Sequence, residues 1–317
     1  MTRRQALAKA TITTTDAAAG LLDPQQARAF VRQIKDQGTF GKAIRQEEKG
    51  SSSGEINKLA TGSRLIRAAT ENADDGYRVG ATFSTVPYQT AKIRLPWEVT
   101  EDTFHENIAG QSLEADLTSE MTTQFGLDLD DLDINGDTAA VGGDAAFLNI
   151  NDGILKQIAT ANVAGRNING STINTGLISK AHYFEALYAM PNKYRARGNL
   201  KWFVSPNRAV SWWEALTDRA GAAGDALLAA RGAGAATGPL GIDFLEIPQL
   251  PDSVVLLANP RNFVRVVSWR IRKRRITGET DAQMAAFDKR FYVFFIKEDI
   301  VVEEMNAVVR VHTMSAP

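Results

Sequence analysis

The sequence predicts an α+β protein, and three features of its 317 residues carry that prediction. A strong helical pattern fills the middle of the chain, alternating apolar patterns typical of strands lie on both sides of it, and no internal repeat occurs. Hydrophobic residues make up 44% of the chain, which is enough for a sizeable core, but no apolar run approaches the length of a membrane span. Cysteine is absent, which excludes disulfides, thiolate catalysis and cysteine metal sites.

The strongest helix signal covers residues 112–134. Ser112 is a suitable N-cap, and Glu114 and Asp116 fall in the first turn, where the helix dipole favours acidic side chains. At about 1.5 Å per residue, the helix would be roughly 34 Å long. Its apolar stripe, which predicts oblique packing against a sheet or another helix, recurs at steps of four residues. The stripe consists of Leu113, Leu117, Met121, Phe125 and Leu129.

The net charge of −1 conceals three blocks of different sign. Residues 1–95 carry 15 Lys and Arg against 9 Asp and Glu, residues 96–155 carry 14 acids and no base, and residues 156–317 carry 21 bases against 14 acids. Repulsion within the middle block would be relieved if a basic segment of the same chain or of a neighbouring chain docked on it.

Residues 1–38 predict an arm without a core of its own, with a short amphipathic helix that begins after Asp23. Residues 39–95 alternate loosely on both sides of a Gly/Ser-rich stretch, which predicts a long hairpin with its tip at Gly50–Gly54. A hairpin with so few apolar residues would be marginal alone in water. We therefore expect the tip to be mobile in the free subunit and to lie on a neighbouring one.

Periodicity predicts further helices and strands beyond residue 140. Helical segments are expected over residues 144–160, 179–190 and 208–216. Strands are expected over residues 200–204, 240–247, 253–258, 263–271, 291–296, 300–303 and 307–312. Residues 220–238 are rich in Gly and Ala, which predicts a flexible loop.

No group of residues predicts catalysis or a cofactor. His105, His182 and His312 lack the spacing of metal ligands, and no nucleophile motif of the GxSxG type occurs. The segment Gly38–Lys42 lacks the full phosphate-loop pattern. The basic run Arg270–Arg275 has no interleaved aromatic residues, so a solvated strand end or a row of salt bridges between subunits explains it at least as well as nucleic-acid binding.

Asp131, Asp133 and Asn135-Gly136 match the first half of a calcium loop of the EF-hand type. The twelfth position of such a loop supplies a bidentate Glu, but here it is Gly142. A helix C-terminus that ends at Asn135-Gly136 is the simpler interpretation. We therefore predict no structural calcium between Asp131 and Gly142.

Two stretches follow an order that is known from one protein family. The segment Trp97–Phe104 precedes the long helix and the Asn135-Gly136 pair, and further on Trp202–Asn207 precedes a helix, a Gly-rich stretch and Leu240-Gly241. In this order the chain resembles, over nearly its whole length, the major capsid proteins of tailed double-stranded DNA phages, which have the Hong Kong 97-type fold. Each motif alone has low specificity, and their order carries the resemblance.

The resemblance implies five segments. Residues 1–38 would be the N-terminal arm, and residues 39–95 the extended loop, a long β-hairpin. Residues 96–150 would be the peripheral domain with its spine helix, and residues 151–258 the axial domain. Residues 259–317 would be C-terminal strands shared between the peripheral and axial domains.

The function implied by the resemblance is that of a major capsid protein without enzymatic activity, which self-assembles into hexamers and pentamers of an icosahedral shell around double-stranded DNA. The implied partners are other copies of the chain, packaged DNA bound without sequence specificity, a portal, and a separate scaffold protein, because only a short arm follows Met1. The resemblance leaves open whether a decoration protein binds, and no membrane partner is expected. We expect the protein in the virion, after assembly in the host cytoplasm.

Two alternatives differ from this function. An encapsulin-like shell protein of a cellular nanocompartment would share the fold and enclose cargo enzymes. A calcium- or nucleic-acid-binding enzyme would rest on the half calcium loop and the basic run alone.

Charge complementarity predicts where subunits meet. Bases of the arm and hairpin should pair with carboxylates along the long helix of a neighbouring subunit, and the arm should contact DNA diffusely. The residues expected between subunits are Lys42, Arg45, Lys58, Arg64, Arg67, Glu114, Asp116, Glu120 and Asp128. The residues expected to face DNA are Arg3, Arg4 and Lys9.

Overall fold

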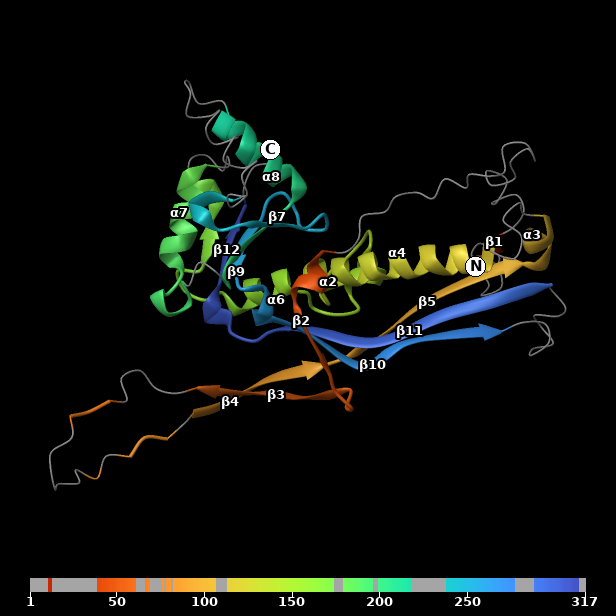
Figure 1. The fold of residues 1–317 in the computed structure, drawn as a ribbon, viewed down its shortest axis with the longest axis horizontal. Coiled ribbons are helices and arrows are strands. Elements are labelled where there is room, and N and C mark those ends of the chain that lie inside the picture. Colours follow the sequence, from red (N-terminus) through yellow and green to blue (C-terminus); the bar gives the residue numbers. More distant parts are fainter. Residues whose placement is uncertain are drawn as a thin grey trace.

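The computed structural model of the chain describes residues 11–12, 39–60, 66–68, 76, 78–80, 82–106, 113–173, 179–195, 199–217, 238–276 and 288–313. Within these residues the chain forms two five-stranded sheets and a separate two-stranded ribbon, with helices packed on the sheets, and the predicted α+β class is confirmed. The molecule is elongated, with one sheet toward each end and the ribbon extending away from both (Figure 1). None of the helices in this part of the chain is both long and apolar enough to cross a membrane.

The first sheet is long because two of its strands have 14 residues each and pair with one another. Its central pairs are antiparallel, and short parallel strands close both edges. In order across the sheet, the strands are β1 (Thr11–Ile12), β5 (Ala91–Thr100), β11 (Lys289–Val302), β10 (Phe263–Ile276) and β2 (Arg45–Glu48). The strands predicted separately over residues 291–296 and 300–303 are one strand, because Lys297, Glu298 and Asp299 continue the pairing with β10.

The predicted long helix is α4 (Leu113–Asn135), which lies along the first sheet (Figure 1). Its buried side chains Phe125, Leu129 and Leu132 belong to one cluster with aromatic residues of β5 and β11. Trp97 stacks on Tyr292 with ring centroids 5.3 Å apart, and Phe125 of α4 lies 6.0 Å from Phe294. Full burial of such a side chain stabilises the fold by about 1.5–3 kcal/mol, so the apolar stripe explains why the helix docks here.

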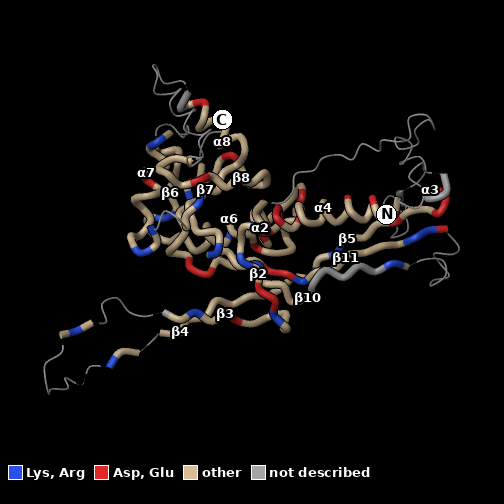
Figure 2. Tube along the Cα trace, viewed as in Figure 1, with Lys and Arg blue, Asp and Glu red and all other residues tan. Residues whose placement is uncertain are grey.

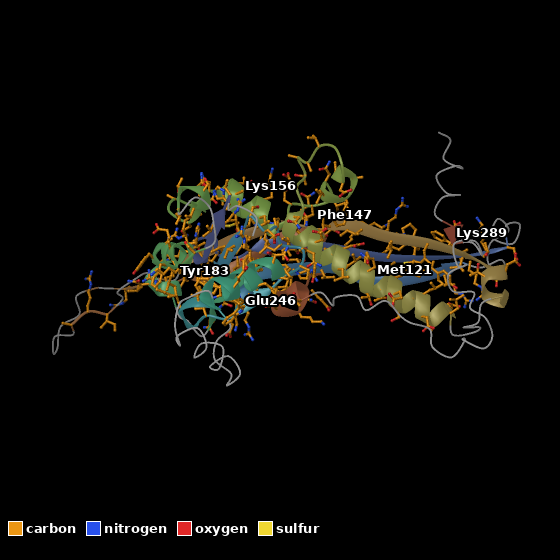
Figure 3. All side chains as sticks on the ribbon, turned by 90° about the horizontal axis from the view of Figure 1, so that it is seen from above. Met121, Phe147, Lys156, Tyr183, Glu246 and Lys289 are labelled. Carbon is orange, nitrogen blue, oxygen red and sulfur yellow. The ribbon has the colours of Figure 1, made fainter. Side chains whose placement is uncertain are left out.

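The second sheet carries most of the remaining helices. Across the sheet, its strands are β6 (Asn167–Asn169), β12 (Val308–His312), β9 (Val255–Ala258), β7 (Lys201–Val204) and β8 (Phe244–Glu246). Tyr183 of α7 (Lys180–Ala189) contacts both Trp202 of β7 and Trp212 of α8 (Pro206–Thr217), with ring centroids 4.9 and 4.8 Å apart. Figure 3 shows Tyr183 in this part of the molecule and Lys289 at the opposite end of the first sheet.

A third apolar cluster joins the two sheets. Phe40, Phe203 and Phe263 meet in it, with ring centroids 5.4–6.4 Å apart, and Ile134 at the end of α4 is fully buried there. The remaining short helices are α2 (Phe40–Ala43), α3 (Glu101–Glu106), α5 (Ala145–Leu148) and α6 (Ile154–Ala161). Single 3₁₀ turns lie at Gly170–Thr172, Asn192–Tyr194, Pro239–Gly241, Pro260–Asn262 and Met305–Ala307.

The predicted hairpin exists, but its predicted tip at Gly50–Gly54 is wrong. Strand β3 (Ser53–Ala60) pairs with β4 (Thr82–Gln89), so Ser53 and Gly54 already lie in the ribbon and the two strands are joined through residues 61–81. The Gly/Ser-rich stretch forms the root of the hairpin, where Thr90 donates its N–H to the carbonyl of Ser52 over 2.8 Å.

Close packing, and not a turn, explains the glycine at position 54. A Cβ there would lie 2.8 Å from the hydroxyl oxygen of Tyr88, the residue directly opposite in β4. Composition alone could not distinguish this close approach from a turn, because glycine serves both. The segment 41–45, expected as part of the hairpin, instead forms most of α2 and the start of β2.

Several predictions fall outside the described residues. These are the helix after Asp23, most of the arm, the N-cap at Ser112 and most of the Gly/Ala-rich stretch 220–238. The helices predicted over residues 179–190 and 208–216 and the strand over residues 200–204 are confirmed. The strand predicted over residues 240–247 is shorter, because a 3₁₀ turn with Leu240 at φ 63° precedes it.

Candidate functional site

A buried charge cluster fastens α4 to the first sheet. Arg265 of β10 donates from Nε to Asp133 over 2.6 Å and from Nη2 to Asp130 over 2.8 Å. Glu298 of β11 lies 3.7 Å from the same guanidinium. The side chains of Arg265, Asp130, Asp133 and Glu298 are 9%, 3%, 2% and 1% exposed. The cluster therefore joins three elements without contact with bulk water.

The short helix α2 is tied to the same cluster. Gly41 of α2 donates its backbone N–H to the carboxylate of Asp130, with distances of 3.1 and 3.2 Å to the two oxygens. A Cβ at position 41 would lie 2.6 Å from Asp130 Oδ1 and 2.7 Å from Arg265 Nη1, so the charge cluster leaves room for glycine alone. Asp130 and Asp133 are three residues apart and so share one face of α4.

Burial dominates the ionisation of this cluster. It raises the pKa of Asp133 to about 6, against the lowering effect of Arg265, and it raises the pKa of Glu298 well above its ordinary value. Burial also raises the pKa of neighbouring Asp299. For Arg265, burial lowers the pKa, but the charges of Asp133 and Glu298 outweigh it and the net effect is a raised pKa.

A second charge cluster lies near the other end of α4 and is partly exposed. Arg290 of β11 holds both oxygens of Glu101 at 2.5 and 2.7 Å and reaches Glu114, in the first turn of α4, at 3.3 Å. Arg275 of β10 contacts the same Glu114 at 3.4 Å. The hydrogen bond to Glu101 is the main cause that raises the pKa of Arg290. Figure 2 shows acidic residues along α4 and basic residues on β10 and β11 near this end.

The hairpin and the preceding strand β2 are anchored to the rest of the chain by charge and by one apolar face. Arg45 pairs with Glu303 at 3.0 Å, and Lys58 donates to the carbonyl of the same residue. Ile56 and Tyr88 pack against the first sheet in a small buried cluster of their own. This face of the ribbon therefore packs against the first sheet of its own subunit.

The opposite face of the ribbon is exposed. Leu59 and Phe83 lie directly opposite one another in the register, and directly opposite residues point to the same side of a sheet. Their exposed fractions are 66% and 77%. Beyond the ribbon, Ile66 is 95% exposed. The hairpin thus presents apolar side chains to solvent, and its ribbon of β3 and β4 extends away from the two sheets (Figure 1).

Arg45, Lys58 and Glu114, which were predicted to pair between subunits, form ion pairs within the chain. Arg45 pairs with Glu47 and Glu303, Lys58 lies 3.9 Å from Glu304, and Glu114 pairs with the two arginines described above. The structure therefore shows that the same chain supplies part of the compensation for the acidic block.

The other predicted pairing residues differ in exposure. Lys42 and Arg67 are exposed, whereas Asp116, Glu120 and Asp128 are half-buried on α4, where Asp128 accepts a hydrogen bond from Gln124. Arg3, Arg4, Lys9 and Arg64 lie outside the described residues. Pairing between subunits and contact with DNA remain predictions for these positions.

The buried cluster was not predicted. Its signal was present in two strands, because Arg265 interrupts the apolar run Phe263–Val267, and Glu298-Asp299 interrupt the apolar pattern of β11. A charged residue in the middle of a buried strand requires a partner of opposite charge. Which of the acids in the middle block supply that partner depends on tertiary contacts alone.

The half calcium loop is the C-terminal part of α4, which confirms the helical interpretation. Asp133 is engaged by Arg265, and the Asn135 amide donates to Asp131 over 2.6 Å and to the carbonyl of Gln249 over 2.7 Å. In the part of the chain that the structure describes, no three His, Cys, Asp or Glu residues are grouped to hold a metal ion. His182 is buried and hydrogen-bonded to the carbonyl of Gly170, as expected of a core histidine.

Comparison with known proteins gives one curated relative and several structural likenesses. No family model matches the sequence. Over 331 aligned residues, the chain is 28% identical to YqbE of Bacillus subtilis (strain 168), described as a prophage capsid protein, and the alignment covers 98% of each chain.

The likenesses to solved structures also extend over nearly the full chain. The satellite phage P4 procapsid with its size determination (Sid) protein matches with a TM-score of 0.63 at 12% identity, covering 96% of this chain and 100% of the other. The capsid of the native GTA particle matches with a TM-score of 0.63 at 14% identity, covering 94% and 99%. Mycobacterium phage Bobi matches with a TM-score of 0.61 at 14% identity, covering 97% and 100%.

Proposed function

We propose that this chain, which has the Hong Kong 97-type fold of phage capsid proteins, is a major capsid protein that self-assembles into an icosahedral shell. The fold implied by the resemblance is confirmed by the structural likenesses, and the curated relative indicates the same function. The encapsulin-like alternative is not favoured, because these relatives are prophage, phage and GTA capsids. Hexamers and pentamers are the capsomers that we expect.

The projecting hairpin is the observation that carries the proposal. A two-stranded ribbon is marginal alone in water, and among the described residues only one face of this ribbon packs on the rest of its own subunit. The other face exposes Leu59 and Phe83, whose burial would be favourable. A neighbouring copy is the occupant that every subunit of a shell has available, and a contact between two different surfaces of identical subunits closes into a ring when the rotation allows it.

The finer organisation that we propose follows the two sheets. Residues 96–150 would contribute the peripheral domain with α4 as its spine, and residues 151–258 the axial domain around the second sheet. Residues 259–317 would be shared, since β10 and β11 run in the first sheet whereas β12 runs in the second. The arm, residues 1–38, and the extended loop, residues 39–95, would lie over neighbouring subunits.

The proposed role is structural and not enzymatic, and the proposed place of the protein is the virion, after assembly in the host cytoplasm. The enclosed partner would be double-stranded DNA, contacted without sequence specificity by bases of the arm. A portal, a separate scaffold protein and a decoration protein are further partners that we propose.

Replacing the exposed apolar pair tests the role of the hairpin. We expect Leu59→Glu with Phe83→Glu to abolish shell formation, because charged side chains would be buried at the contact with the neighbour. Val141→Glu is the matched control, since Val141 is 94% exposed and lies in the loop between α4 and α5, away from the hairpin. Shells counted by electron microscopy, with circular dichroism to check folding, measure the effect. Normal shells from the double variant would contradict the proposal.

The proposed charge pairing between subunits has a separate test. Arg64→Glu with Arg67→Glu should impair assembly, and adding Asp116→Lys with Glu120→Lys should partly restore it. Glu114 is left unchanged, because it pairs with Arg275 and Arg290 of its own chain. Unimpaired assembly of the arginine variant at both low and moderate salt would rule out the pairing while leaving the capsid function intact.

A further inference from the structure

We propose that the buried cluster of Arg265, Asp130, Asp133 and Glu298 binds one proton at neutral pH, and that release of this proton loosens the joint between α4 and the first sheet. The ligand of this site is the proton itself. The contacts that carry the inference lie within one subunit, so it does not depend on the proposed function.

The carboxylates of the cluster outnumber its cation, and one proton lowers the excess of negative charge from two to one. One guanidinium faces three carboxylates, and the four side chains are between 1% and 9% exposed. If all three carboxylates were ionised, the cluster would carry an excess of two negative charges without access to water. An uncompensated charge in such a site is strongly unfavourable, and a buried acid avoids it by taking up a proton.

The hydrogen bonds indicate which carboxyl group holds the proton. Asp133 and Asp130 accept hydrogen bonds from Arg265, and Asp130 accepts another from the N–H of Gly41. Both oxygens of Glu298 lack a hydrogen-bond partner among the described residues, and the guanidinium lies 3.7 Å away. Glu298 therefore gains least from being ionised. Its pKa, raised by burial and then by the charge of Asp133, agrees with this assignment.

The groups that surround Glu298 add further negative charge. Asp130 and Asp133 face it from α4, Arg265 from β10, and Asp299 from its own strand. Asp299 is itself stabilised as a carboxylate by Asn151 at 2.8 Å and the N–H of Gln89 at 2.7 Å. Asp152, which precedes α6, is a further carboxylate that interacts with Asp299.

Loss of the proton has a defined mechanical consequence. A Glu298 carboxylate would repel Asp130 and Asp133, the two residues by which α4 is held to β10. Because Asp130 also holds Gly41 of α2, this short helix would be affected together with α4. The proton thus couples pH to the position where α4, the first sheet and α2 meet.

The sign of the pH dependence follows from the raised pKa of Glu298. Above its ordinary value of 4.5, the folded chain retains a proton that the unfolded chain has released. Stability falls with pH wherever the folded state binds more protons, so this contribution declines from about pH 4.5 upward until the folded-state pKa is passed. Asp133, with its pKa raised to about 6, acts in the same direction.

The first experiment compares thermal unfolding of the full-length chain with that of Glu298→Gln between about pH 5 and about pH 8. We expect the wild-type midpoint to fall relative to that of the variant by about 3 °C or more over this range. Glu246→Gln, on an exposed residue of β8, is the control and should follow the wild type. Parallel curves for the wild type and Glu298→Gln would overturn the proposal.

The second experiment detects the proton directly in the wild type and uses variants only to assign the signal. Infrared spectroscopy of the wild type near neutral pH should show the C=O stretch of a protonated carboxylic acid, which Glu298→Gln removes and Glu246→Gln retains. Absence of this band in the wild type would overturn the proposal. Hydrogen exchange, corrected for intrinsic rates, then tests whether the contact between α4 and the sheet loosens. Amides of residues 129–135 should exchange faster in the wild type than in Glu298→Gln at alkaline pH and at the same rate at lower pH. Equal exchange at alkaline pH would contradict the loosening.

Discussion

The two arginine clusters at opposite ends of α4 use the same chemistry in different surroundings. Arg265 pairs with two carboxylates of α4 and has a side chain that is 9% exposed, whereas Arg290 pairs with Glu101 and Glu114 and is 24% exposed. Around Arg265, the loss of one charged partner leaves the others buried and uncompensated, with no water to solvate them. Around Arg290, water and salt can replace a lost partner. The comparison teaches that burial, more than the number of ion pairs, sets what each cluster contributes.

The apolar side of α4 shows the same gradient. In its C-terminal half, Phe125, Leu129 and Leu132 are 2–5% exposed. In its N-terminal half, Leu117 and Met121 are half-buried against the same cluster, and only Leu113, its first residue, is buried to the same degree, at 4% exposed. Burial of the apolar side is therefore continuous in the C-terminal half of α4 and interrupted between Leu113 and Phe125.

The largest effect is expected from Arg265→Met. The substitution leaves buried carboxylates without a cation, and the free energy of unfolding should fall by about 3–5 kcal/mol. Urea unfolding of the purified chain measures the loss, and the soluble yield reports it if the variant fails to fold. A stability equal to that of Arg290→Met would break the comparison between the two clusters.

Leu132→Ala should come next. Truncating this side chain, which is 2% exposed, should lower the free energy of unfolding by about 2–5 kcal/mol. Leu117→Ala is the matched change in the other half of α4 and should lower it clearly less, because the half-buried site loses less contact. Denaturant midpoints of the two variants decide the matter, and an equal loss in both would show that α4 is held evenly along its length.

Arg290→Met should have the smallest effect. Its ion pairs are partly solvated, so we expect a loss of about 1 kcal/mol at low salt, and less as salt rises. Unfolding at two ionic strengths measures it. The arginine of the buried cluster supplies the contrast, since the loss in Arg265→Met should change little with salt. If salt did not reduce the loss of unfolding free energy in Arg290→Met, the cluster around Arg290 would behave like the buried cluster around Arg265.

Local periodicity determined the elements that repeat over many residues. The four-residue apolar steps predicted α4 to within one residue at each end, and alternating or continuous apolar runs predicted β7, β9 and β12. These predictions succeed because helix and strand place side chains with periods of 3.6 and 2, which a linear sequence displays directly. The order of the elements, in turn, was enough for the resemblance to the capsid fold.

The tertiary structure decided what depends on contacts between distant residues. The Gly/Ser-rich stretch is the root and not the tip of the hairpin, because the pairing of Gly54 with Tyr88 sets the register. Glu298 interrupts the apolar pattern but not strand β11, because Arg265 lies beside it on the neighbouring strand β10. The acidic block likewise gave no indication that Asp130 and Asp133 are buried while Asp116 is not. The sequence shows how many charges a helix carries, but it does not show which face of the helix packs against the rest of the fold.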